Sequence, residues 1–417
     1  MKILIYGINF APDLVSTPKY TSEMAGWLAE RGHEVRVVTA PPYYPAWRVA
    51  EGYRAGRYAR ERWPFAGGAT ADVWRCPLWV PAQPTGSRRL LHLASFAVSS
   101  LPVMLGQLFW RPQLVVMIEP TLFCGPGALL TALLGRAKAW LHIQDLEVDA
   151  AFEMGLLPSG RGRIRGFATM IEGWLLRRFD RVSTISEAMR DRVLAKRVPA
   201  DRVALFPNWV DVGSIAPMTQ PSAFREELGL DPGTHVALYA GNLGEKQGLE
   251  LLIDAAQRLR DRSDVMFVIA GSGSGRERLE RLAEGLPNVK FLPLQPLERL
   301  NDLLNLADVH LLPQRADAAD LVMPSKLTGM VASGRTVVAT AAPGTQVAKV
   351  VADCGLVVAP GDGDAFATAI TTLLDDRERR EDLGARARAY AEANLAQAAI
   401  MARFEADAER LVGPGSS

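Results

Sequence analysis

The sequence predicts an α/β protein built of two doubly wound domains, each with a parallel sheet covered by helices. Short apolar runs alternate with segments of helical periodicity along nearly the whole chain, which is typical of parallel sheets. A length of 417 residues is too great for one ordinary hydrophobic core and favours two domains. The hydrophobic content of 48% and the charged content of 22% are those of a soluble globular protein.

The first predicted domain covers residues 1–207 and opens with a βαβ pattern. Residues 2–7 form an apolar run, residues 19–31 have helical periodicity, and residues 35–38 begin a second strand. Further strand-like runs follow at 114–118, 139–143 and 181–184. Residues 41–86 are rich in Pro, Tyr, Trp and Gly and interrupt this alternation, so we interpret them as a long functional loop.

The second predicted domain covers residues 222–394. Its strand-like runs lie at 236–240, 265–270, 290–292, 309–312, 336–339 and 356–358. Residues 208–221, between the domains, contain prolines and little periodicity, which is typical of a linker. Open α/β sheets bind ligands at the carboxyl ends of their strands, so we expect the site in the cleft between the domains.

Charge is distributed unevenly along the chain, although the formal net charge is only +1. Residues 1–207 hold 26 of the 47 Lys and Arg but only 17 of the 46 Asp and Glu, a balance of +9 against −8 in the remainder. This basic first half indicates an anionic partner. The three cysteines, Cys76, Cys124 and Cys354, fit no disulfide or metal pattern, and the first apolar run is too short for a signal peptide. We therefore expect a cytoplasmic protein.

Two segments of the first domain combine apolar and basic residues. Residues 90–110 are apolar and nearly long enough to span a membrane, and Arg88 and Arg89 precede them. Pro102 and several polar residues argue against a spanning helix, which leaves a buried helix or one that dips into the bilayer. Residues 161–179 carry arginines around a second apolar stretch. Together the segments predict peripheral attachment to an anionic membrane surface.

The stretch from Asp317 to Gly334 has the features of an anion-binding site. It follows an apolar strand-like run, carries Asp317 and Asp320, and enters a helix at the Pro-Ser-Lys step 324–326. The free N–H groups and the dipole of a helix start attract a phosphate, and the ammonium group of Lys326 adds a positive charge. The alternative is an ordinary surface helix with a solvated lysine.

Two glycine-rich loops of the second domain also follow strand-like runs. Residues 241–248 read Gly-Asn-Leu-Gly-Glu-Lys-Gln-Gly, so the backbone can approach a ligand while Lys246 supplies charge. The spacing is not that of a Walker A loop. Residues 271–275 resemble a dinucleotide-binding fingerprint only superficially, because the third glycine comes too early.

In the first domain, His142 and Asp145 lie at the carboxyl end of a strand-like run. A histidine there can orient a sugar hydroxyl or exchange a proton with it, and a carboxylate can accept that proton. The alternative is a buried core histidine beside a helix cap at Asp145.

Nine passages carry a resemblance that extends over nearly the whole chain. They are residues 6–12, 19–21, 32–35, 39–45, 74–77, 142–145, 207–209, 241–248 and 324–328. In this order they resemble the bacterial exopolysaccharide glycosyltransferases of retaining glycosyltransferase family 4, especially the colanic-acid type. The resemblance implies two Rossmann-like domains facing across a cleft (the GT-B fold), a nucleotide-sugar donor held mainly by the second domain, and no essential metal or cofactor. It also implies a C-terminal helix and tail over 395–417 that cross back to the first domain.

The same resemblance suggests roles for individual residues. The candidate catalytic residues are Asp320, His142 and Asp145. The candidate donor-binding residues are Gly241, Asn242, Gly244, Lys246, Gln247, Gly271, Gly273, Leu294, Gln295, Asp317, Ser325, Lys326, Leu327 and Thr328. The candidate acceptor-binding residues are Asn9, Thr17, Lys19, Tyr20 and Glu119.

The sequence departs from the family pattern inside the expected donor site. Asn242 and Gln247 stand where the family commonly has Arg and Lys, so Lys246 and Lys326 are expected to balance the donor diphosphate. Gly329 stands where a second glutamate would bind ribose hydroxyls.

We expect a retaining glycosyltransferase that moves a sugar from a nucleotide-diphosphate donor, with UDP favoured, to a lipid-linked (polyprenyl-diphosphate) saccharide in exopolysaccharide biosynthesis. It would act in the cytoplasm, peripheral on the inner face of the plasma membrane, without a nucleic-acid partner. Two alternatives stay open. One is a nucleotide-sugar epimerase on the same fold, and the other is a non-catalytic nucleotide-sugar-binding component of a polysaccharide complex.

Overall fold

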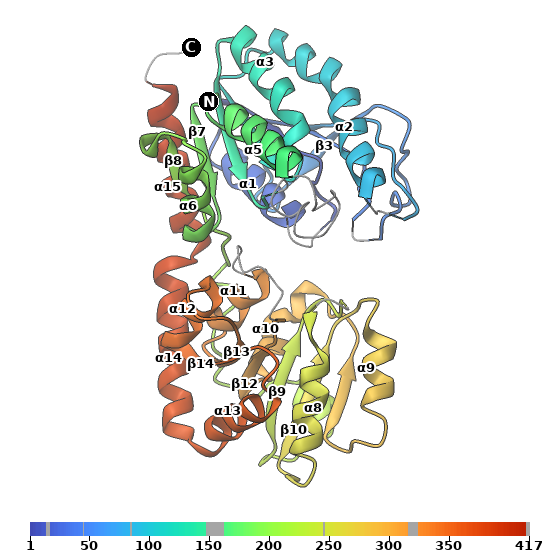
Figure 1. Ribbon diagram of the computed structural model, residues 1–417, viewed down its shortest axis with the longest axis vertical. Helices are drawn as coiled ribbons and strands as arrows, with labels where there is room; N and C mark the ends of the chain where they lie inside the picture. Colours follow the sequence, from blue (N-terminus) through green and yellow to red (C-terminus); the bar gives the residue numbers. More distant parts are fainter. Residues whose placement is uncertain are drawn as a thin grey trace. The chain divides into compact units, whose positions relative to one another are not determined.

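The computed structural model describes residues 1–13, 17–44, 46–83, 86–146, 162–244, 247–315 and 324–413. The chain forms two compact units (Figure 1). Unit 1 comprises Met1–Pro207 and Met401–Ser417, and unit 2 comprises Asn208–Ile400. Each unit has its own sheet and its own buried core.

Within its described residues, unit 1 has one eight-stranded sheet of order β3-β4-β2-β1-β5-β6-β7-β8. The strands are β1 Lys2–Tyr6, β2 Glu34–Thr39, β3 Ala59–Pro64, β4 Thr70–Arg75, β5 Leu114–Glu119, β6 Lys138–Ile143, β7 Arg181–Thr184 and β8 Val203–Leu205. All neighbouring pairs are parallel except β3 with β4. The central strand β1 pairs with β2 on one side and β5 on the other, as in Ile5 with Val37 and Val116. The strand order therefore reverses between β1 and β5.

The stretch 41–86 is not one long loop, and that interpretation was wrong. It contains the antiparallel pair β3 and β4, with Arg60 opposite Trp74 and Arg62 opposite Asp72. The edge strand β3 alternates exposed and half-buried residues and carries charged side chains, so it lacks the apolar run that marks a buried strand.

Helices cover the unit 1 sheet. They are α1 Thr17–Glu30, α2 Gly86–Gly106, α3 Gly125–Gly135, α5 Gly162–Leu176, α6 Glu187–Ala195 and the later part of α15 Gln397–Val412. Among the described residues, Gly86–Phe109 is the one helical stretch long and apolar enough to cross a membrane, with 33% of its most apolar window buried. One face of α2 packs into unit 1, where Ser100 lies 2.6 Å from the phenol oxygen of Tyr6 and Phe96 contacts the same ring.

The end of α15 packs into unit 1 through an aromatic cluster. The Phe404 ring stacks on Phe206 at 4.7 Å and contacts Trp140 at 4.6 Å between ring centroids. Asp407 of the same helix accepts a hydrogen bond from Arg181 on β7. These contacts explain why Met401 and the residues after it belong to unit 1, although the helix begins in unit 2.

Within its described residues, unit 2 has a six-stranded parallel sheet of order β11-β10-β9-β12-β13-β14. The strands are β9 His235–Ala240, β10 Val265–Ala270, β11 Val289–Leu292, β12 Val309–Leu312, β13 Thr336–Thr340 and β14 Gly355–Val358. The strand order reverses between β9 and β12. The carboxyl ends of these two strands therefore lie at the topological switch point, where open α/β sheets bind ligands.

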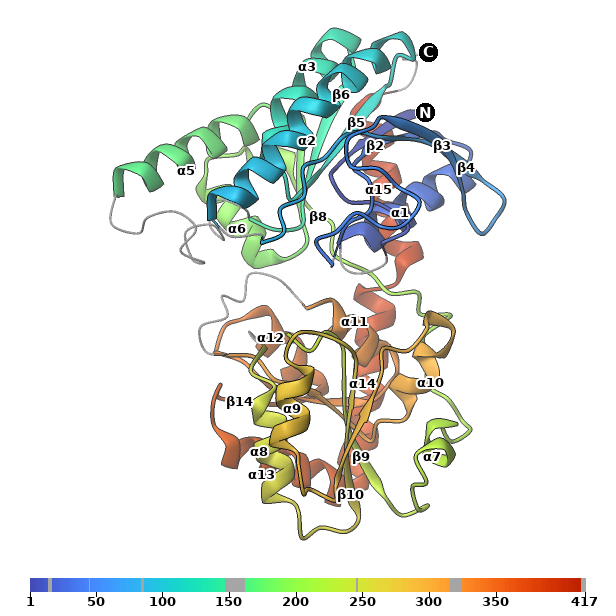
Figure 2. The same ribbon diagram turned by 90° about the vertical axis from the view of Figure 1, so that its right-hand side faces the viewer.

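Helices cover both faces of the unit 2 sheet (Figure 2). One core contains residues of α8 Glu250–Arg258, α9 Arg276–Leu282 and α13 Gly363–Asp375. The cores of the other face contain residues of α7 Phe224–Glu227, α10 Leu300–Asn305, α11 Ser325–Ala332, α12 Gln346–Cys354 and α14 Arg377–Asn394. Because both faces are covered, the central strands are mostly apolar and buried rather than alternating.

Candidate active site

The loop after β9 lies against the loop after β10, and glycine makes this possible. A Cβ built on Gly271 would lie only 1.9 Å from the carbonyl oxygen of Gly241, and Gly271 has φ +145°. A Cβ on Gly273 would lie 2.6 Å from the backbone of Leu243. The two loops are joined by a hydrogen bond of 2.8 Å from Leu243 N–H to the Ser272 carbonyl. Gly271 and Gly273 therefore support the first loop by close packing.

Lys326, in the first turn of α11, reaches this supported loop. Its Nζ donates a hydrogen bond of 2.5 Å to the phenol oxygen of Tyr239 on β9 and a second, short one to Gln247 Oε1. A Cβ on Gly241 would lie 3.2 Å from Cε of Lys326, so a side chain at 241 would crowd the lysine stem. Residues that are far apart in the chain thus meet at the switch point of unit 2.

The environment of Lys326 is unusual for a lysine. Within the described part of the chain its partners are a phenol and an amide, both neutral, and no carboxylate pairs with it. Burial lowers the pKa of its ammonium group from 10.5 to about 8. The alternative of a solvated surface lysine does not hold at this position. A positive charge removed from water without a counter-charge favours an anionic ligand.

The start of α11 adds a second attraction for an anion. Pro324 is the N-cap residue, and it provides no side-chain hydrogen bond to the first turn of the helix. The first N–H groups of a helix lack intrahelical partners and lie at the positive end of its dipole. Ser325 is exposed at this end. Together, Lys326 and the α11 start form a cradle suited to a phosphate group.

The structure assigns the other expected donor residues to different environments. Leu327 is fully buried in a core cluster, so its side chain cannot contact a ligand. Thr328 is buried too, and its hydroxyl donates to the Ser325 carbonyl.

The expected donor residues in the loops differ in their environments. Leu294 is exposed, and Gln295 donates to the Pro293 carbonyl. In the first loop, Asn242 and Gly244 lie against one another. Lys246, Asp317 and Asp320 lie outside the described residues.

His142 on β6 is held as a core histidine. Its Nδ1 lies 3.0 Å from Ser183 Oγ, its Nε2 lies 3.1 Å from the Gln144 amide nitrogen, and it is 2% exposed. Burial lowers its pKa to about 3, so the ring is neutral near pH 7. Both ring nitrogens therefore have partners within unit 1, as the alternative of a core histidine expects. Asp145 follows in the same loop and is half-buried.

Some of the expected acceptor residues gather at the carboxyl edge of the unit 1 sheet. Asn9 follows β1 and Glu119 ends β5, and these adjacent parallel strands flank the switch point of that sheet. Of the α1 residues, Thr17 is half-buried, Lys19 pairs with Glu23 at 3.7 Å, and Tyr20 is buried in the core.

Two residues at these edges were not identified from the sequence. Tyr239, inside an apolar run, holds Lys326. Arg75, at the end of β4, is 1% exposed and donates 3.1 Å and 2.5 Å hydrogen bonds to the carbonyls of Ala40 and Ala11. Its guanidinium also pairs with Glu61 at 2.7 Å. Arg75 thereby joins the loops after β1 and β2. The sequence feature that could have identified Arg75 is its position in the Trp-Arg-Cys-Pro passage 74–77.

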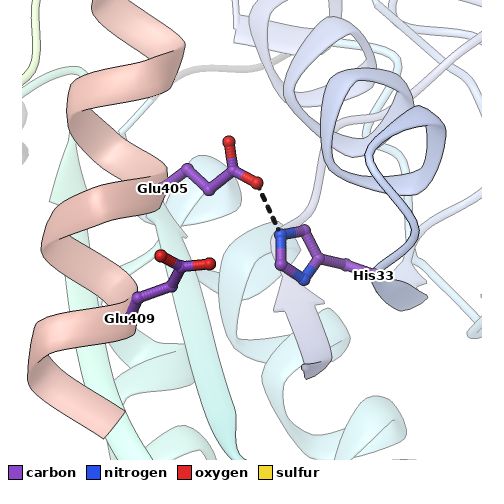
Figure 3. Close-up of side chains that lie close together, drawn as sticks. All are labelled: His33, Glu405 and Glu409. Carbon is purple, nitrogen blue, oxygen red and sulfur yellow. Dashed lines mark hydrogen bonds and ion pairs between the residues drawn. The ribbon is translucent and has the colours of Figure 1, made fainter. Parts of the chain in front are cut away.

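One His and carboxylate group among the described residues is compact enough to hold a metal ion. The ligand atoms of His33, Glu405 and Glu409 lie within 4.8 Å of one another (Figure 3). Glu405 already pairs with His33 at 2.9 Å and Arg31 at 2.6 Å, and the Met1 amino group lies 3.0 Å from His33 Nδ1. Because His33 directly precedes β2, the group lies at the amino edge of the sheet. It is best explained as a clamp that holds α15.

Two Rossmann-like units, the second with an anion cradle at its switch point, define the class of GT-B glycosyltransferases, and comparison with known proteins agrees. The family model for a glycosyl transferase 4-like domain matches residues 17–209, and that for glycosyl transferases group 1 matches residues 222–390. The chain is 48% identical over 354 residues to the colanic acid biosynthesis glycosyl transferase WcaI of Escherichia coli (strain K12), covering 84% of this chain and 85% of that protein. The chain therefore belongs to the family of glycosyltransferases that combine a glycosyl transferase 4-like domain with a group 1 domain, and it is a glycosyltransferase.

More distant proteins extend the comparison. The D-inositol 3-phosphate glycosyltransferase of Kineococcus radiotolerans is 28% identical over 88% of this chain and 84% of its own length. Sucrose-phosphate synthase of Thermosynechococcus elongatus has a TM-score of 0.74 at 18% identity, covering 98% of this chain and 99% of its own. The Anabaena protein HepE in complex with UDP has a TM-score of 0.68 at 16% identity, with the same coverage. These structures confirm the predicted GT-B fold class.

Proposed function

We propose that the protein is a retaining glycosyltransferase that transfers a sugar from a UDP-sugar to a lipid-linked oligosaccharide in exopolysaccharide assembly. The observation that carries the proposal is the charged Lys326, whose partners among the described residues are neutral, in the first turn of α11. A nucleotide diphosphate supplies the negative charge that the described neighbours of Lys326 lack. The relative WcaI, which functions in colanic acid biosynthesis by its name, supports the polysaccharide context.

In this proposal the protein acts mainly by stabilising the leaving diphosphate. Negative charge grows on the leaving phosphate as the glycosidic bond breaks, and a preorganised cation and helix start lower the energy of that state. The leaving phosphate itself helps to deprotonate the acceptor on the same face of the sugar, so a protein nucleophile is not needed. The countercharge comes from Lys326 and from Lys246, and the reaction is independent of a metal ion.

We further propose that the enzyme acts in the cytoplasm at the inner face of the plasma membrane. A lipid-linked acceptor lies in that membrane, and the basic first half of the chain is suited to anionic lipids. Exposed apolar side chains of unit 1, such as Val98 in the middle of α2 and Phe109 just beyond its end, are further support.

The donor assignment is tested by thermal unfolding with a panel of nucleotide sugars. A ligand at a hundredfold excess over its Kd stabilises the folded protein by about 2.7 kcal/mol, which corresponds to roughly 5–10 °C in Tm. We expect such a shift with one UDP-sugar and its loss in Lys326→Met. The absence of a shift with every nucleotide sugar in the panel would contradict the proposed donor site.

The transferase reaction is separated from its alternatives by donor turnover with and without a lipid-linked acceptor. A transferase consumes the donor fast only when the acceptor is present. An epimerase converts the donor without the acceptor, and a non-catalytic binding component does neither while still showing the thermal shift.

A further inference from the structure

Helix α5 presents an apolar stripe to solvent. Phe167, Met170, Ile171 and Trp174 are 60%, 58%, 45% and 50% exposed, at the three- and four-residue spacing that places side chains on one helix face. The opposite face is buried through Leu175 and Leu176. An exposed apolar row of this kind on a helix marks an interaction surface.

An open groove of about 830 Å³ runs beside this stripe, between α5 and the end of α6. The groove is lined by Thr169, Met170 and Gly173 of α5, by Arg177 just after α5, and by Lys196 and Arg197 just after α6. A Cβ on Gly173 would lie 3.3 Å from the Lys196 carbonyl oxygen, so glycine keeps the two helices close here.

The charges around the groove divide into a neutralised pair and free cations. Lys196 is buried and pairs with Glu172 at 2.6 Å, which balances both charges. Arg177 donates 2.8 Å to the Lys196 carbonyl, and the Arg178 guanidinium stacks 3.9 Å from the Trp174 ring. Among the described residues, no carboxylate pairs with Arg177, Arg178 or Arg197, and all three are exposed.

Cations at the carboxyl ends of α5 and α6 also complement the helix dipoles. That effect explains the position of Arg177 and Arg197 without any ligand. It does not explain four exposed apolar side chains in a row beside them. Cations next to an exposed apolar row that includes a tryptophan are typical of surfaces that enter the membrane interface.

We propose that the α5–α6 groove binds the phosphate headgroup of an anionic membrane phospholipid, while the stripe from Phe167 to Trp174 enters the adjoining acyl region. Arg177 and Arg197 meet the headgroup phosphate, and Arg178 keeps its charge at the interface above Trp174. The inference rests on the peripheral attachment proposed above and assigns it to one site.

The test measures binding of the full chain to vesicles of phosphatidylcholine alone and of phosphatidylcholine mixed with phosphatidylglycerol. We expect the wild type to bind the anionic vesicles, more weakly as salt increases. The double variant Arg177→Gln/Arg197→Gln should bind about thirtyfold more weakly. A second double variant, Phe167→Ser/Trp174→Ser, should lose binding without a change in net charge.

The matched control is Arg281→Gln/Arg379→Gln, which removes the same charge from exposed positions on α9 and α14 of unit 2. It should bind like the wild type. Because all the substituted residues are exposed, each variant should keep the wild-type Tm, which verifies its folding.

The outcomes separate the two proposals. Failure of the wild type to bind either vesicle would contradict peripheral attachment itself. Wild-type binding that both groove variants retain would overturn the groove assignment and leave attachment to another segment. Release of the protein by inorganic phosphate, but not by chloride of equal ionic strength, would show a site for free phosphate instead. A concentration-dependent dimer abolished in Phe167→Ser/Trp174→Ser, without vesicle binding, would show that the stripe joins two copies of the chain.

Discussion

The ammonium group of Lys326 and the phenol oxygen of Tyr239 lie 2.5 Å apart at the switch point of unit 2. Tyr239 also donates 2.8 Å to the Asn242 carbonyl, so the same phenol ties the lysine to the loop after β9. The strand positions the phenol, and the helix start positions the lysine. This contact brings the glycine loop after β9 and the helix start at 324–326 together in one anion-binding site.

Replacing Lys326 by methionine should lower kcat/KM for the donor by about tenfold to a hundredfold. A charge-assisted contact with the diphosphate is worth about 1.5–3 kcal/mol. Because leaving-group charge grows toward the transition state, kcat should fall as well as donor affinity. Steady-state kinetics measure both. Lys349→Met, which removes an exposed charge from α12, is the control. Equal kinetics in the two variants would contradict the assignment of Lys326 to the donor site.

The activity should depend on pH through Lys326. Its pKa is lowered by burial to about 8, so raising the pH through 8 removes the charge that the diphosphate needs. We expect kcat/KM for the donor to fall above this pH, since that parameter reports the free enzyme. Lys326→Arg, which stays charged, should show no such fall.

Unfolding does not explain this expected fall. The pKa of Lys326 is lower in the folded protein than in the unfolded chain, so between about pH 8 and 10.5 the unfolded chain binds more protons. The contribution of Lys326 to stability therefore rises with pH over this range. A donor profile that is the same for the wild type and Lys326→Arg would count against the assignment.

Transfer should persist in excess EDTA. A cation and a helix start are available to balance the diphosphate, and the His33 group lies at the amino edge of its sheet, where Glu405 is already paired with His33 and Arg31. Initial rates with and without the chelator measure this. Loss of activity that magnesium or manganese restores would contradict it.

Replacing Gly271 by alanine should destabilise unit 2 by about 3 kcal/mol and weaken donor binding. The new Cβ would lie 1.9 Å from the Gly241 carbonyl oxygen at a φ of +145°, so the loop under Lys326 must shift. Urea unfolding measures the free energy. Gly233→Ala is the control because a Cβ there meets nothing within 4 Å, and it should change stability little.

Local sequence information was sufficient for the fold class. The alternation of apolar runs and helical segments predicts parallel sheets. A strand buried on both faces is a short continuous apolar run, whereas a helix that covers the sheet repeats its apolar residues with a period of 3.6. The helix start at 324–326 and the glycine loop after β9 could also be predicted from the sequence. Pro and Gly restrict or extend the φ values of their own residues, so their effect is local. The edge strand β3 was missed because a charged, half-exposed strand leaves no apolar run.

Only the tertiary structure decided what these motifs touch. The sequence predicted a lysine at a helix start but left open whether solvent surrounds it, and its burial against Tyr239 depends on a partner 87 residues away. The neighbours of His142, which make it a core histidine, include Ser183 on the next strand. The α5–α6 groove likewise exists because two helices pack side by side. Burial and pairing are properties of surfaces that meet in space, and a linear sequence does not record which surfaces meet.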